Sequence, residues 1–358
     1  MSKQLQISDI LLEIKSTEGD SFEWNEEQLF AEMELKSANN STLAIKVLSI
    51  FGGFLATLAF LGFLFISGLY DSKFGLIFFG ALFIILSIIS SKVYNKLVID
   101  TSAISAYVMG FAMLAFGLTQ LEWNETIICF FFIVIAIVAL RFIRSYVFSF
   151  ISFLIMVGSL IVIFIENDLY NGFHFLTASV AIFVFYLFQY ESQLLTNYRK
   201  LIFLYDPLRI AAICSFIVFL YLVSKINFLH ISQELSFISS SVIICLIIYL
   251  MYKIRGILLL EKNKELIVAS VAILLLLIPT INFPAISGSI LIILCCFRNN
   301  YKTGFAIGVL ALLYFVSQFY YDLTYTLLVK SLLMLVCGII FFACYFLTNK
   351  RFAIHEEN

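Results

Sequence analysis

Residues 320–347 read YYDLTYTLLVKSLLMLVCGIIFFACYFL, and after Asp322 the only charged side chain in this stretch belongs to Lys330. An α-helix rises about 1.5 Å per residue, so about 20 apolar residues cross the roughly 30 Å hydrocarbon core of a bilayer. The stretch therefore predicts a membrane-spanning helix that carries one lysine inside the membrane.

Similar apolar runs recur along the whole chain. Of its 358 residues, 62% are hydrophobic and 13% are charged, whereas soluble domains have about 45–50% apolar and about 25% charged residues. A soluble core does not bury this many all-apolar helices, so the sequence predicts an all-α polytopic membrane bundle with about 12 transmembrane helices. The predicted spans are 47–69, 74–91, 98–120, 126–140, 146–165, 172–189, 208–226, 235–253, 265–281, 284–297, 303–319 and 326–347.

Lysine and arginine are distributed unevenly over the connections between these spans. If the N-terminus is cytoplasmic, 19 basic residues fall on the cytoplasmic side and only two, Lys73 and Lys225, fall on the other. Cytoplasmic connections are enriched in basic residues, so both termini are predicted to be cytoplasmic. The outer connections are too short for an extracytoplasmic catalytic domain, and we expect a multi-pass protein of a bacterial inner membrane.

The chain divides into three predicted regions. Residues 1–41 contain short amphipathic helical patterns and form a cytoplasmic segment, residues 42–349 form the transmembrane domain, and residues 350–358 form a cytoplasmic tail. The longest inner connection separates two candidate halves, 42–190 and 208–349, of six spans each. Two interpretations of residues 1–41 stay open: packing against the inner loops, or docking of a membrane or cytoplasmic protein partner.

Lys330 is the first candidate for a substrate or ion pathway. It lies six residues after Thr324, or about 9 Å into the membrane at helical rise. A lysine at this depth can direct its amine outward along the helix, and Asp322 lies two turns earlier. Two roles remain open for Lys330: a structural anchor, or a contact to a substrate or ion.

A proline-containing segment before the tenth span is the second candidate. Pro279, Pro284 and Gly288 lie within ten residues of one another, and the following span, 284–297, is short. The fourth span, 126–140, is also short and occupies the matching place in the first half. Short or interrupted spans at matching positions indicate a transporter site, although short spans also occur where neighbouring helices cover them.

Polar residues at the outer helix ends are the third candidate. Glu122 and His174 belong to this group, as do Gln120, His230 and Gln318. A proton-linked site is one interpretation, because histidine titrates near neutral pH; solvated interface residues are the other. The pathway candidates are therefore Lys330, Asp322, Pro279, Pro284, Gly288, Glu122 and His174.

Other motifs give little chemistry. Gly304 and Gly308 form a GxxxG pattern, which permits close helix packing either within the chain or between copies. The seven cysteines all lie in apolar runs, and the net charge is −1. We find no nucleotide-binding, metal-binding or catalytic motif, so we expect no cofactor, no metal and no nucleic-acid partner, with the lipid bilayer as the surroundings.

Both ends of the membrane domain resemble a known family. Residues 45–65, IKVLSIFGGFLATLAFLGFLF, and residues 319–342, FYYDLTYTLLVKSLLMLVCGIIFF, are similar to the first and last spans of the bacterial domain-of-unknown-function 4401 (DUF4401) family. The pattern in the last span is Tyr321, Leu327-Leu328, Lys330-Ser331 and Gly338. This resemblance implies a multi-spanning inner-membrane protein and brings no known substrate, cofactor or catalytic residue.

The sequence favours a non-enzymatic membrane protein. A carrier or permease-like module for a small solute, ion or lipid is the leading interpretation. The alternative is a structural or regulatory membrane subunit that acts through residues 1–41. An intramembrane enzyme is disfavoured, because the spans contain no pair of acids and no nucleophile with a neighbouring base.

Overall fold

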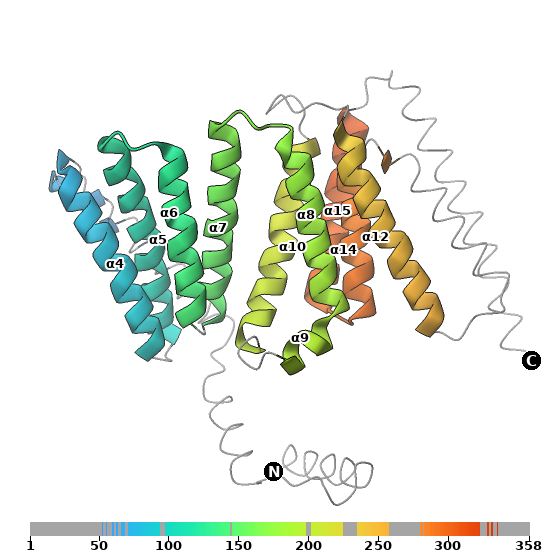
Figure 1. Ribbon diagram of the computed structural model, residues 1–358, viewed down its shortest axis with the longest axis horizontal. Coiled ribbons are helices and arrows are strands. Elements are labelled where there is room, and N and C mark those ends of the chain that lie inside the picture. Colours follow the sequence, from blue (N-terminus) through green and yellow to red (C-terminus); the bar gives the residue numbers. More distant parts are fainter. Residues whose placement is uncertain are drawn as a thin grey trace, which may run out of the picture. The chain divides into compact units, whose positions relative to one another are not determined.

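The computed structural model describes residues 71–93, 97–143, 145–197, 202–224, 235–257, 280–281 and 283–322, with isolated positions before and after them. In this part of the chain, the regular structure is helical throughout (Figure 1). The chain divides into two compact units, Met1–Trp123 and Asn124–Asn358. Each unit is described by itself.

The first unit contains α4 (Lys73–Val93) and α5 (Leu97–Gln120), which pack as an antiparallel pair. The two backbones approach closely, because a Cβ at Gly80 would lie 2.9 Å from the Gly110 carbonyl oxygen. Small residues at helix crossings allow this approach in membranes. Leu76, Met109 and Met113 form the buried apolar contact between the two helices.

The second unit contains the remaining described helices. They are α6 (Glu125–Phe142), α7 (Tyr146–Glu166), α8 (Gly172–Gln189), α9 (Glu191–Asn197), α10 (Ile202–Ser224), α12 (Ser236–Ile257), α14 (Pro284–Arg298) and α15 (Lys302–Asp322). Helix α10 lies at the centre, against α7, α8 and α14. Helix α12 packs on α8 and α14, and helix α15 packs on α14. A large apolar core joins α8, α10, α12, α14 and α15.

Three of these helices, α8, α12 and α14, run in the same direction. At one end, His174 near the start of α8 meets Ser239 near the start of α12. At the other end, Phe185, Leu250 and Cys295, from the later turns of the three helices, line one groove. Helices α12 and α14 are therefore parallel. Two helices separated by one further membrane span cross the membrane in the same direction, so this agrees with the predicted span 265–281 between them.

Nine of the twelve predicted spans fall on described helices. Eight of these helices are long and apolar enough to cross a membrane, and α14 is a shorter apolar helix. The predicted spans 47–69, 265–281 and 326–347 lie largely outside the described residues, as do the predicted cytoplasmic segment 1–41 and the tail 350–358. The division into halves 42–190 and 208–349 stays a prediction.

Two details of the predicted spans are wrong. The fourth span is not short: α6 has 18 residues, and it begins after Asn124, which caps the first turn by accepting a hydrogen bond from the Thr126 backbone N–H at 2.8 Å. Among the described helices that match predicted spans, α14, with 15 residues, is the short one. The argument from two short spans at matching positions therefore fails.

The connection before the seventh span is also more helical than predicted. It contains α9, and α10 begins at Ile202 with Pro207 inside it. This span was predicted to begin at residue 208. Tyr205, only 4% exposed, anchors the first turns by donating a hydrogen bond to the Leu187 carbonyl at 2.9 Å.

The GxxxG pattern packs inside the chain. A Cβ at Gly304 would lie 2.7 Å from Cys296 Sγ, and one at Gly308 would lie 3.0 Å from the Ile292 and Ile293 side chains. Both glycines therefore face α14, and they bring α15 close to it. This contact agrees with close helix packing within the chain, one of the two roles that the sequence left open for the GxxxG pattern.

Candidate functional site at the starts of three parallel helices

A layer of buried polar side chains lies at the starts of α8, α12 and α14. His174 is 1% exposed, and its Nδ1 lies 3.3 Å from Ser239 Oγ on α12. This contact joins two helices that are 65 residues apart in sequence. Titratable side chains inside membrane helices are costly unless they find polar partners, and they commonly mark functional sites.

Hydroxyl groups surround this contact. We call the set of buried polar residues in the first turns of the three helices the polar layer; it comprises His174, Thr177, Ser236, Ser239, Ser240, Ser287 and Ser289, each 6% exposed or less. Most of its hydroxyls donate to a carbonyl one turn earlier, such as Thr177 to Phe173 at 2.7 Å and Ser289 to Ala285 at 2.8 Å. The Ser240 hydroxyl is buried without a hydrogen-bond partner among the described residues.

The start of α14 owes its shape to Pro284 and Gly288. Pro284 is the first residue of the helix, where the missing N–H breaks no helical hydrogen bond. Gly288 faces α10, because an added Cβ would lie 2.5 Å from Leu220 Cδ1. These two residues let α14 begin inside the bundle, beside α10 and α12.

The structure brings together only part of the predicted site. His174, Pro284 and Gly288 lie at the same end of the second unit. Glu122 belongs to the first unit, where it is exposed in the turn after α5 with a φ of 60°. Asp322 is the last residue of α15, while Lys330, Pro279 and His230 lie outside the described residues.

At the opposite end of the bundle, Arg209 organises a second polar group. This arginine, in α10, is 8% exposed. Its guanidinium donates to Glu191 at 3.2 Å and to Asp206 at 2.7 Å, and its Cζ lies 3.7 Å from the centre of the Tyr301 ring. We call Arg209, Glu191, Asp206, Asn299 and Tyr301 the arginine clamp.

The arginine clamp ties together four helix ends. Asn299, just after α14, donates to Glu191 at 2.9 Å and to the Phe188 carbonyl at 2.7 Å. Burial raises the pKa of Tyr301, next to the start of α15, to about 12, although Arg209 opposes the shift. Its phenol is therefore neutral at physiological pH, and the ring is a stable cation–π partner.

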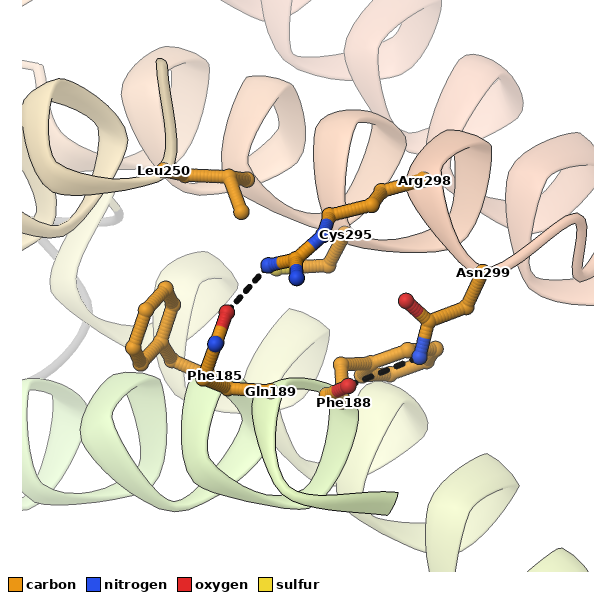
Figure 2. Close-up of a pocket in the computed structure, with 7 residues that line it drawn as sticks. All are labelled: Phe185, Phe188, Gln189, Leu250, Cys295, Arg298 and Asn299. Atoms are coloured by element: carbon orange, nitrogen blue, oxygen red, sulfur yellow. Dashed lines mark hydrogen bonds between the residues drawn. The ribbon is translucent and has the colours of Figure 1, made fainter. Parts of the chain in front are cut away.

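A shallow groove adjoins the arginine clamp between α8, α12 and α14. Figure 2 shows its lining: Phe185, Phe188, Gln189, Leu250, Cys295, Arg298 and Asn299. Arg298 donates a hydrogen bond to the Gln189 side-chain oxygen. The groove is too narrow to enclose a water molecule, so it does not enclose a small molecule.

In the described part of the chain, no group of three or more His, Cys, Asp or Glu side chains is placed to hold a metal ion. The described cysteines, Cys129, Cys214, Cys245, Cys295 and Cys296, are all unpaired thiols.

Sequence reasoning missed most of both polar groups. Arg209 counted only as a basic residue of an inner connection, although the run YDPLR places Asp206 one turn before it. The runs SFISSS, 236–241, and PAISGS, 284–289, open two predicted spans with hydroxyl residues. Hydroxyls at matching ends of apolar spans were the signal for the polar layer.

These helices define a multi-spanning helical membrane protein. Residues 42–351 match the family described as Domain of unknown function (DUF4401). The chain therefore belongs to the DUF4401 family, as the resemblance at its two ends indicated. None of the curated proteins matches it, and none of the solved structures does.

Proposed function

We propose that the protein is a carrier or permease-like module for a small solute, ion or lipid. In this proposal it resides in a bacterial inner membrane with both termini cytoplasmic, and it is not an enzyme. The proposal concerns the second unit, whose helix bundle contains both the polar layer and the arginine clamp.

The contact between His174 and Ser239 carries the proposal. It joins two membrane helices through polar side chains that are almost fully buried. Burying a hydroxyl or an imidazole costs free energy unless it is hydrogen-bonded, and apolar side chains would pack the same helices without that cost. A solute or ion that passes through the bundle needs polar groups of this kind along its path.

The arrangement of the two polar groups also supports transport. Carriers expose a central site to one side of the membrane at a time. The polar layer lies at the starts of α8, α12 and α14, and at the other end of the bundle the arginine clamp joins α9, α10 and the turn between α14 and α15. A clamp of charged and aromatic contacts is suited to open and close while the polar layer holds the cargo.

Ligand-induced stabilisation tests the proposal. The purified full-length protein is screened in mild detergent against amino acids, carboxylates, sugars, inorganic ions and lipids, and the midpoint of thermal unfolding is measured. We expect at least one class to raise the midpoint for the wild type and not for Ser239→Ala. Ser149→Ala is the matched control, because it removes a buried hydroxyl from α7.

Two results would count against a carrier. One is that no class of compound stabilises the protein. The other is that Ser239→Ala and Ser149→Ala respond to the ligand equally well. If a stoichiometric partner then co-purifies from gentle detergent and is lost when residues 2–36 are deleted, the subunit interpretation takes precedence.

A further inference from the structure

The groove beside the arginine clamp presents hydrogen-bond donors that lack acceptors. Arginine has N–H donors and no acceptor, so its bond to Gln189 fixes the amide with its oxygen toward Arg298. The Gln189 Nε2 atom is then a donor, and it is buried without a hydrogen-bond partner among the described residues. Figure 2 shows both side chains meeting in the groove.

The hydrogen-bond donors of Arg298 are only partly used among the described residues. The guanidinium carries five N–H donors, and its hydrogen bond among the described residues has a neutral amide as the acceptor. Its position in the last turn of α14 also stabilises the helix end, because a positive charge there interacts favourably with the helix dipole. Several strong donors remain for a further acceptor.

Neither basic group at the groove is paired with an acid among the described residues, and Glu191, which accepts from the groove residue Asn299, is already paired with Arg209. The ion pairs found among the described residues both belong to Arg209. Neither Arg298 nor the partly exposed Lys253 has a carboxylate within 4 Å in that part of the chain. Lys253 lies three residues after the groove residue Leu250 on α12, which places the two on the same face of that helix.

The location of the groove points to a lipid. It lies between the C-terminal ends of α8, α12 and α14, where these helices leave the hydrocarbon core. Its inner wall is apolar, with Phe185 and Leu250, and the Phe185 ring meets the half-exposed Tyr249 ring with centroids 5.7 Å apart. Basic groups between membrane helices at this level suit phospholipid headgroups.

We propose that the rim of this groove binds the phosphate of an anionic phospholipid. Arg298 donates to the phosphate oxygens while the Gln189 side-chain oxygen holds its guanidinium in place, Lys253 adds charge, and an acyl chain lies along Tyr249. The groove has no enclosed volume, so the headgroup lies over its mouth. A zwitterionic lipid binds less well, because its ammonium group faces Arg298 and Lys253. This site does not depend on the proposed transport.

Thermal unfolding of the delipidated full-length protein in mild detergent tests the proposal, with phosphatidylglycerol, phosphatidylcholine or inorganic phosphate added. We expect phosphatidylglycerol to raise the midpoint more than phosphatidylcholine does, and phosphate to have little effect. Arg298→Gln should lose at least half of the phosphatidylglycerol shift. Arg141→Gln is the matched control, because it removes an exposed basic residue in the last turn of α6, and it should keep the full shift.

Three outcomes would overturn the proposal. Equal shifts with the two lipids would remove the charge argument. An equal shift with inorganic phosphate would mean that the site takes the free anion. A full shift in Arg298→Gln would place the lipid elsewhere. If Arg298→Gln does not survive purification, Lys253→Gln and Gln189→Met decide, and both must reduce the shift for the proposal to stand.

Discussion

The guanidinium carbon of Arg209 lies 3.7 Å from the centre of the Tyr301 ring, although the two residues are 92 positions apart. The same guanidinium reaches Glu191 and Asp206. One arginine thus connects α9, α10 and the turn between α14 and α15. A charge that is so nearly buried is stable only with such partners, so its contacts determine how firmly these helix ends are held.

Arg209→Met should destabilise the bundle. Removing one member of a buried ion pair costs about 3–5 kcal/mol, and a surface pair is worth about 0–1 kcal/mol. Because the two acids are 32% and 63% exposed, we expect a loss of about 2 kcal/mol, between these limits. Thermal unfolding in detergent measures it, with Arg141→Met as the control. A midpoint as high as that of the control would contradict a structural role for Arg209.

The two acids should differ in importance. Glu191 accepts hydrogen bonds from both Arg209 and Asn299, which belong to different parts of the bundle. Asp206 is 63% exposed and pairs with Arg209 within one helix. Glu191→Gln should therefore cost about 1–2 kcal/mol, and Asp206→Asn less than about 0.5 kcal/mol. Midpoints of thermal unfolding compare them, and the reverse order would refute the assigned contacts.

Tyr301 should act through its ring. Tyr301→Phe keeps the face that Arg209 contacts, so it should leave stability nearly unchanged. Tyr301→Leu loses the cation–π contact and should cost about 1–2 kcal/mol. The difference between the two variants in thermal unfolding isolates the ring. Equal losses in both would assign the effect to the hydroxyl instead.

Close packing at Gly288 should be intolerant of a methyl group. Gly288→Ala pushes against Leu220, which is fully buried, and overpacking costs about 1–3 kcal/mol. Gly158 in α7 has no atom within 4 Å of an added Cβ, so Gly158→Ala should be neutral or slightly stabilising. Detergent stability of the purified variants separates the two; a Gly288→Ala variant as stable as Gly158→Ala would mean that α14 and α10 are not packed as described.

Much of the fold was predictable because the hydrocarbon core imposes a length on each helix. Runs of apolar residues locate the spans without reference to their neighbours, so nine of them fall on described helices. Helix ends were harder to predict. The seventh span was predicted from residue 208, whereas α10 begins at Ile202, and the contact from Tyr205 to Leu187 that supports the earlier start joins residues 18 apart.

The candidate site was predicted less well, for a related reason. His174, Pro284 and Gly288 stood out by residue type, and they do lie at one end of the bundle. The partner of His174 did not stand out by residue type, because Ser239 is one serine among several and only packing decides which of them faces α8. Arg209 resembled the other basic residues of the inner connections, and its burial results from side chains on three other segments.

Accessibility of Ser240 tests the proposed transport pathway most directly, because it needs no knowledge of the cargo. Ser240 is 0% exposed in the structure. A membrane-impermeant thiol reagent is added to whole cells that express Ser240→Cys, and labelling is located by peptide mass spectrometry. Glu122→Cys serves as the exposed control, and Ala136→Cys, buried in α6, as the protected one.

We predict that Ser240→Cys is labelled more slowly than Glu122→Cys and clearly faster than Ala136→Cys, because a carrier opens this layer to the outside. Labelling no faster than at Ala136→Cys, in whole cells and in inverted vesicles alike, would contradict a pathway through the polar layer.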